Sequence, residues 1–181
     1  MGKLKVLVLG DGLLGSEIVK QTEWDYISRK EHGFDITDPE TYHLLTSVEF
    51  GSIQHCKYDV ILNCIANTDT YSADKTSHWK TNYEGLSHLI KFCNDWKIKL
   101  VHISTDYVFD GKNAKPYVET DATNPINVYG NSKLAGEKIL QEIMLSNATI
   151  VRTSWLYSEF GNNFVDTMLR LGKERDELRV V

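Results

Sequence analysis

Short apolar runs alternate along the chain with longer segments that have helical spacing. The apolar runs cover residues 4–9, 25–28, 58–64, 100–103 and 148–152. They are mostly apolar on both faces, which is typical of strands buried inside a parallel sheet. Because helical segments separate the strands, the pattern predicts an α/β fold: a doubly wound, Rossmann-type parallel sheet with helices on both faces.

The segments between the runs give the expected helices and two further strands. Helices are predicted at residues 16–21, 39–50, 77–96 and 161–171, and in the segment that contains Tyr129. Asp38 is expected to cap the second of these helices, with Pro39 at its first position. Short strands are also expected to end at residues 35–38 and to begin at residues 178–181.

Three glycines follow the first apolar run, just before a helical segment. Gly10, Gly12 and Gly15 form a G-x-G-x-x-G pattern between strand and helix, the placement that dinucleotide binding requires. Gly10 permits a tight turn, Gly12 lets the backbone approach a pyrophosphate, and Gly15 lets helix and strand pack closely. The alternative is a strand–turn–helix connection that binds no ligand.

The end of the second strand carries cations where a strictly NAD-binding site would carry an acid. Ser28, Arg29 and Lys30 stand in the region where an Asp or Glu would bind the ribose 2′-hydroxyl. Two cations suit a 2′-phosphate, so the sequence favours NADPH and leaves NADH open. The alternative is that both cations are simply solvated.

Candidate acid–base chemistry lies between residues 101 and 137. An apolar strand ends in Ser104 and Thr105, and after a long loop Tyr129 and Lys133 stand four apart in a helical segment. An ammonium beside a phenol favours the phenolate, so we expect Lys133 to lower the pKa of Tyr129. A hydroxyl, a phenol and an amine together suit proton transfer to or from an oxygen while a cofactor moves a hydride.

The Tyr-x-x-x-Lys spacing alone is weak evidence, because the chain contains it three times. The other copies are Tyr26/Lys30 and Tyr71/Lys75, and neither follows a strand that ends in hydroxyl residues. We interpret them as chance surface pairs.

Five segments in order resemble one enzyme family. They are HISTDYVFDG, PYVETD, NVYGNSKLAGE, VRTSW and GNNFVDTML, and the resemblance, to the dTDP-4-dehydrorhamnose reductases of the extended short-chain dehydrogenase/reductase superfamily, spans residues 5–181. It implies NADPH-dependent reduction of the C4 ketone of a deoxyhexose nucleotide sugar, with Thr105, Tyr129 and Lys133 as the catalytic set. Magnesium is implied by the resemblance only.

The resemblance and the glycine pattern together give the remaining site residues. The expected cofactor-binding residues are Gly10, Gly12, Leu13, Leu14, Gly15, Ser28, Arg29, Lys30, Asp35, Ile36, Cys64, Ile65, Ala66, Thr68, Asn82, Tyr129 and Lys133. The expected substrate-binding residues are Thr105, Asp106, Tyr107 and Trp155. In the loop after residue 64, Ala66 and Thr68 agree with the family pattern, whereas Asn67, Asp69 and Tyr71 depart from it. For Asn82 a solvated surface position, and for Trp155 ordinary packing, remain open.

The resemblance also bears on domain organisation. Residues 1–181 are expected to form an NAD(P)-binding Rossmann domain, without the smaller sugar-binding portion that follows it in the family. Two other functions stay open: a non-catalytic NADP-binding module, and a nucleotide-sugar epimerase or dehydratase, which shares the Tyr-Lys pair.

The composition limits the kinds of partner that we expect the chain to bind. The 181 residues carry a formal net charge of −5, which gives no basic surface for nucleic acid. Three widely spaced cysteines indicate reduced thiols, and no apolar run is long enough to span a bilayer, so we expect a cytoplasmic protein. The six histidines show no ligand spacing, no metal site is expected, and His102 is interpreted as a satisfied core residue. The expected partner is a nucleotide sugar; a homodimer stays open.

Overall fold

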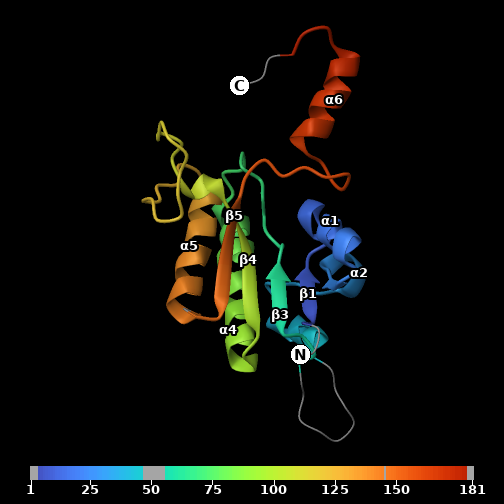
Figure 1. Cartoon of the computed structure of the whole chain (residues 1–181), viewed down its shortest axis with the longest axis vertical. Coiled ribbons are helices and arrows are strands. Elements are labelled where there is room, and N and C mark those ends of the chain that lie inside the picture. The colour runs from blue at the N-terminus through green and yellow to red at the C-terminus, as the bar shows by residue number, and fades with distance from the viewer. Residues whose placement is uncertain (1–3, 47–55, 145, 179–181) are drawn as a thin grey trace, which may run out of the picture.

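A five-stranded parallel sheet forms the centre of the computed structural model, which describes residues 4–46, 56–144 and 146–178 (Figure 1). The strands lie in the order β2-β1-β3-β4-β5, and every neighbouring pair is parallel. They are β1 (Val6–Leu9), β2 (Asp25–Ile27), β3 (Val60–Asn63), β4 (Lys99–Thr105) and β5 (Ala148–Thr153). The predicted doubly wound, Rossmann-type α/β fold is confirmed.

Helical segments follow each strand. They are α1 (Leu13–Thr22), α2 (Arg29–His32), the 3-10 helix η1 (Pro39–Leu45), α3 (Lys75–Trp79), the π-helical η2 (Lys80–Gly85), α4 (Leu86–Trp96), the 3-10 helix η3 (Asp106–Val108), α5 (Val128–Ile143) and α6 (Phe164–Glu174). From β1 the chain moves to one side of the sheet to form β2, and then to the other side to form β3, β4 and β5 in order. Crossovers between parallel strands are right-handed, so α1 lies on one face of the sheet and α4 and α5 lie on the other. The carboxyl ends of β1 and β3 therefore border a switch point, where ligands of such sheets bind.

Two local expectations need correction. The strand expected to end at residues 35–38 is absent, because the Asp35 carboxylate accepts the Thr37 backbone N–H at 2.9 Å and Asp38 N–H bonds back to the Asp35 carbonyl. That segment is a turn. Asp38 caps the next helix as expected, yet the helix is 3-10 rather than α. Residues 47–50 of that predicted helix lie outside the described residues, as does most of the strand expected at 178–181.

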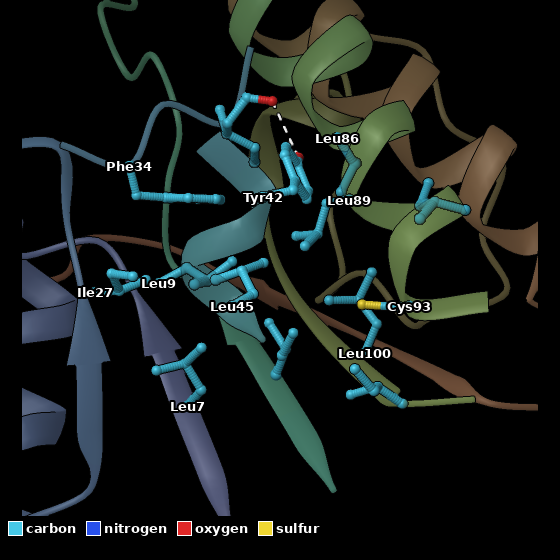
Figure 2. Packing of buried hydrophobic residues seen from close by; sticks show 14 of the residues in the cluster. Leu7, Leu9, Ile27, Phe34, Tyr42, Leu45, Leu86, Leu89, Cys93 and Leu100 are labelled. Carbon is cyan, nitrogen blue, oxygen red and sulfur yellow. Dashed lines mark hydrogen bonds between the residues drawn. The ribbon is translucent and has the colours of Figure 1, made fainter. Parts of the chain in front are cut away.

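The hydrophobic core fills the face of the sheet covered by η1, α4 and α5. Figure 2 shows Leu7 and Leu9 of β1 packed toward Leu45 of η1, with Leu86, Leu89, Cys93 and Leu100 further along. The predicted apolar stripe of α4 (Leu86, Leu89, Ile90 and Cys93) is fully buried. Tyr42 also belongs to this core, and its buried hydroxyl donates a hydrogen bond to the Ile36 carbonyl at 3.1 Å (Figure 2). Packing of the α4 stripe thus fixes the ends of β1, β3 and β4 relative to one another.

The predicted long helix at residues 77–96 runs unbroken through α3, η2 and α4, with a π-helical stretch in its middle. Close packing surrounds that stretch. A Cβ on Gly136 of α5 would lie 2.7 Å from the Asn82 carbonyl oxygen, and one on Gly85 would lie 2.9 Å from Ile36 Cγ2. Glycine at both positions lets η2 sit directly against α5 and the loop after β2. Among the described residues no helix combines the length and apolarity needed to cross a bilayer.

Candidate cofactor and active site

The glycine loop has the geometry of an anion-binding turn. Gly10 adopts a positive φ of 97°, and its N–H donates to the Ile27 carbonyl of β2 at 2.9 Å. A Cβ on Gly15 would lie 2.0 Å from the Gly10 carbonyl oxygen, so helix and strand touch there. Gly12 faces open space and leaves the N-terminus of α1 without a side-chain cap. The free N–H groups and the helix dipole at this end suit a phosphate.

A cavity of about 510 Å³ lies at the switch point beside this loop. The predicted cofactor residues that line it are Gly10, Gly12, Arg29, Asp35, Ile36, Cys64, Ile65 and Ala66. Sequence reasoning missed Asp11, Phe34, Thr37, Asp74, Thr76, Ser77, Lys80 and Thr81, which complete the lining. The other predicted cofactor residues lie outside this lining: Leu13, Leu14, Gly15, Ser28, Lys30, Thr68, Asn82, Tyr129 and Lys133. Leu13 and Leu14 form the first turn of α1, and Thr68 is exposed.

Cations at the cavity differ from the predicted pair. Ser28 is buried and caps α2 by accepting the Glu31 N–H at 3.2 Å, so it has a structural role. Arg29 lines the cavity and pairs with Asp35 at 3.3 Å, while the second lining cation is Lys80 of η2 rather than Lys30. Partial burial raises the pKa of Asp35, but hydrogen bonds from Thr37 and the charges of Arg29 and Lys80 outweigh it, so its pKa is lowered. The carboxylate therefore stays ionised between the two cations.

Tyr129 lies in the first turn of α5, pressed against the residues that follow β4. A Cβ on Gly130 would lie 2.2 Å from the Tyr107 carbonyl oxygen, which shows how closely α5 approaches η3. The Tyr129 ring centroid is 5.7 Å from that of Tyr107 and 6.1 Å from that of His78. Thr105 is buried at the end of β4, where its hydroxyl accepts the Tyr107 N–H at 3.2 Å. Two of the predicted catalytic residues, Thr105 and Tyr129, thus share one buried corner.

The pKa of Tyr129 moves opposite to the expectation. Burial raises it, the Thr105 side chain beside the phenol lowers it in part, and the nearby Asp106 raises it further. Lys133 does not lower this pKa, because its Nζ is held elsewhere, donating to the Ile103 carbonyl at 2.6 Å. The expectation was wrong because four-residue spacing places both side chains on one face but does not bring an ammonium to the phenol oxygen.

Asn82 is buried and ties three elements together, so the solvated alternative is wrong. Its side-chain oxygen accepts the Asn67 N–H at 2.8 Å, and its amide donates to the Asn67 carbonyl and to Ser132 Oγ of α5, each at 2.9 Å. These bonds fix the loop after β3 to the helix that carries Tyr129 and Lys133. Asn82 therefore positions the site from outside the cavity.

Comparison with known proteins places the chain in a family. The sequence profile of the family described as RmlD substrate binding domain matches residues 4–181. The chain belongs to this family. A dTDP-4-dehydrorhamnose reductase of Escherichia coli is 44% identical over 132 residues, covering 72% of this chain and 44% of the relative. A spore coat polysaccharide biosynthesis protein of Bacillus subtilis is 36% identical over 183 residues, covering 98% and 62%.

Solved structures of RmlD-family proteins have the same fold. A dTDP-4-dehydrorhamnose reductase of Clostridium acetobutylicum gives a TM-score of 0.83 at 35% identity, covering 98% of this chain and 62% of that one. One of Bacillus anthracis, in complex with NADP, gives 0.83 at 35% identity, covering 98% and 63%. The chain spans about half the length of these curated relatives and of others that it matches.

The predicted substrate residues of this RmlD-family chain separate into two groups. Thr105, Asp106 and Tyr107 lie beside Tyr129, whereas Trp155 is 71% exposed beyond β5 and packs edge-on against Phe164 of α6. Asp106 also borders a second cavity of about 640 Å³ along β5. Among residues 4–46, 56–144 and 146–178, no three His, Cys, Asp or Glu side chains gather as a metal site, so magnesium has no structural support.

Proposed function

We propose that the chain binds NADPH and reduces the C4 ketone of a deoxyhexose nucleotide sugar of the dTDP-4-dehydrorhamnose type. The observation that carries this is one sheet edge bearing an uncapped glycine loop beside a cavity and, two strands away, a buried Tyr129 next to Thr105. The printed activity of the Escherichia coli relative and the NADP complex of the Bacillus anthracis structure support it. Residues 1–181 are, in this proposal, an NAD(P)-binding Rossmann domain.

The residues present fit such a cofactor. The free N–H groups at the start of α1 would bind the pyrophosphate, and Gly12 would leave room for its approach. Arg29 and Lys80, both at the cavity, would bind a 2′-phosphate through their positive charges. Ile65 and Ala66 line the end nearer β3 and give an apolar wall. When bound, the cofactor supplies a hydride; the chain must then supply the proton.

Tyr129 is proposed as the proton donor. Because burial raises the pKa of its phenol, the side chain keeps its proton at neutral pH and can deliver it as negative charge develops on the ketone oxygen. In this proposal the hydroxyl of Thr105, which lies at the end of β4, orients that oxygen, and Lys133 supports the site by joining α5 to β4 through its bond to the Ile103 carbonyl. Acid assistance of this kind contributes about 10² to 10⁴ in rate.

A deuteride-transfer experiment tests the proposal. The chain is incubated with dTDP-4-dehydrorhamnose and NADPH deuterated at the transferable position, and the product sugar is examined by NMR. We expect deuterium at C4 of the sugar together with oxidised cofactor, faster with NADPH than with NADH. NADPH that binds but leaves no deuterium in the sugar would overturn the reductase assignment in favour of a binding module. Deuterium at another carbon would point to different sugar chemistry.

A further inference from the structure

Three buried side chains behind the active site form one continuous row of hydrogen bonds. Asn63 ends β3, His102 lies in β4 and Lys133 lies in α5, and each is 1% exposed. Asn63 Nδ2 is 3.1 Å from His102 Nδ1, and His102 Nε2 is 3.1 Å from Lys133 Nζ. The row reaches from the strand beside the cofactor cavity to the lysine assigned to the catalytic set.

The direction of the first bond follows from the backbone. Asn63 Oδ1 accepts the Ile65 N–H at 3.0 Å, and a backbone N–H can only donate. The other end of the same amide, the NH₂ group, must therefore face His102. An NH₂ group only donates, so His102 Nδ1 has to accept and cannot carry a proton.

The second bond follows from the first. His102 is fully buried, and burial is the main cause that lowers its pKa well below the usual value, so the imidazole is neutral even beside an uncharged Lys133. A neutral imidazole with a bare Nδ1 carries its proton on Nε2, which makes Nε2 a donor toward Lys133. An ammonium has no lone pair to receive that proton, whereas a neutral amine has one.

We infer that Asn63 and His102 are a positioning pair that fixes the Nε2–H tautomer of His102 and thereby favours the neutral amine of Lys133. In this state Lys133 Nζ accepts from His102 and donates to the Ile103 carbonyl, so every bond of the row joins a donor to an acceptor. With Lys133 as an ammonium, His102 has to accept through Nε2 and carry its proton on Nδ1. That proton would face the Asn63 NH₂ group, donor against donor.

The electrostatic surroundings of Lys133 agree with this assignment. Burial lowers the pKa of Lys133 to about 8, against the opposing effects of Glu137 on the same helix and Cys64 after β3. Glu137 is itself engaged by Arg152 of β5 through two bonds of 3.0 and 2.6 Å, and it also accepts from Ser104. The acid nearest to Lys133 along α5 is therefore already satisfied by an arginine.

The consequence for catalysis rests on the proposed function. A lysine held near its titration point can take up a proton close to neutral pH, whereas a permanently charged one cannot. The tautomer and the ionisation state are properties of the chain without cofactor or sugar. Their measurement therefore succeeds or fails independently of any reductase activity.

The test is NMR of the ¹⁵N-labelled chain, with His102 assigned by the signal lost in His102→Gln. Long-range ¹H–¹⁵N correlations distinguish the two neutral tautomers, and ¹³C-labelled lysine with a Lys133→Met assignment variant reports the titration of Lys133. We expect the Nε2–H tautomer in the unaltered chain above pH 8, where Lys133 is mostly the amine. In Asn63→Asp the new carboxylate can only accept, so His102 should switch to Nδ1–H. The ratio of ammonium to amine at Lys133 should then rise about tenfold or more at a given pH.

Asn131→Asp is the matched control, since it adds the same charge at an exposed position on the helix that carries Lys133. It should leave the His102 tautomer unchanged, which separates the hydrogen-bond effect from added charge. An Nδ1–H tautomer in the unaltered chain above pH 8 would overturn the inference outright, even if Asn63→Asp does not fold. So would a folded Asn63→Asp variant that retains Nε2–H.

Discussion

Gly15→Ala tests whether the glycine loop is built on direct contact between helix and strand. The added Cβ would lie 2.0 Å from the carbonyl oxygen of Gly10, a distance that real Cβ atoms do not reach. The obstacle is backbone, so no side chain can rotate away. Restoring even a tight contact of 3.0 Å requires α1 and β1 to separate by about 1 Å at this point.

The magnitude follows from two opposing effects. Overpacking against backbone costs about 3 kcal/mol, the upper end of the usual range, whereas alanine in place of glycine within a helix gains about 1 kcal/mol. The expected loss is therefore about 2 kcal/mol in the free energy of unfolding. For a chain of this size that corresponds to a Tm lower by about 4 to 8 °C. The displaced helix end should also weaken NADPH binding by about tenfold, since the phosphate contacts are lost together.

Calorimetry and an NADPH fluorescence titration on the same samples give both quantities. Gly172→Ala is the matched control, because this glycine also lies inside a helix, α6, with no atom within 4 Å of the added Cβ. It should raise stability by about 0.5 to 1 kcal/mol and leave NADPH affinity unchanged. A Gly15→Ala chain as stable as the Gly172→Ala chain would show that α1 does not lie against the Gly10 carbonyl as closely as stated.

Two further predictions concern charges. Arg29→Ala should weaken the binding of NADPH about tenfold and that of NADH little, because it removes one charge-assisted bond to the 2′-phosphate. Lys30 lies outside the cavity lining, so Lys30→Ala should weaken the binding of neither cofactor. Equal losses of NADPH affinity in the two variants would contradict the assignment of Arg29. Lys133 has a folded-state pKa of about 8, below its unfolded value, so between pH 8 and about 10.4 the unfolded chain binds more protons and stability rises with pH. Urea unfolding should show this rise of about 1 to 3 kcal/mol relative to Lys133→Met, and parallel curves for both proteins would exclude it.

Local patterns in the sequence account for the fold and for part of the site. The apolar runs predict every strand of the sheet, because each run is short and helical segments separate it from the next. The glycine loop is likewise predictable from local sequence, since the positive φ of Gly10 and the contact of Gly15 with the Gly10 carbonyl arise within one strand–turn–helix unit. The incorrect strand prediction at residues 35–38 also has a local cause. The Asp35 carboxylate accepts a hydrogen bond from the Thr37 backbone N–H, and this bond favours a turn over a strand.

The missed residues depend on tertiary structure. Lys80 reaches the cavity because the π-helical stretch of η2 packs against the loop after β2, and no spacing in the sequence connects Lys80 with Arg29. The Lys133 side chain is directed toward β4 rather than toward the phenol, because its Nζ contacts the Ile103 carbonyl and the His102 imidazole, which lie 30 and 31 residues earlier in the chain. Trp155 followed a strand as expected, yet exposure at that position was not predictable from its neighbours.

The most direct test of the account compares Tyr129→Phe with Tyr71→Phe. Both tyrosines have a lysine four residues on, but Tyr71 is 98% exposed whereas Tyr129 is buried beside Thr105. The measurement is NADPH oxidation in the presence of dTDP-4-dehydrorhamnose, with NADPH affinity determined in parallel. We expect a loss of about 10² to 10⁴ in turnover for Tyr129→Phe at nearly unchanged affinity, and no loss for Tyr71→Phe. Near-normal turnover in Tyr129→Phe would remove the phenol from the mechanism.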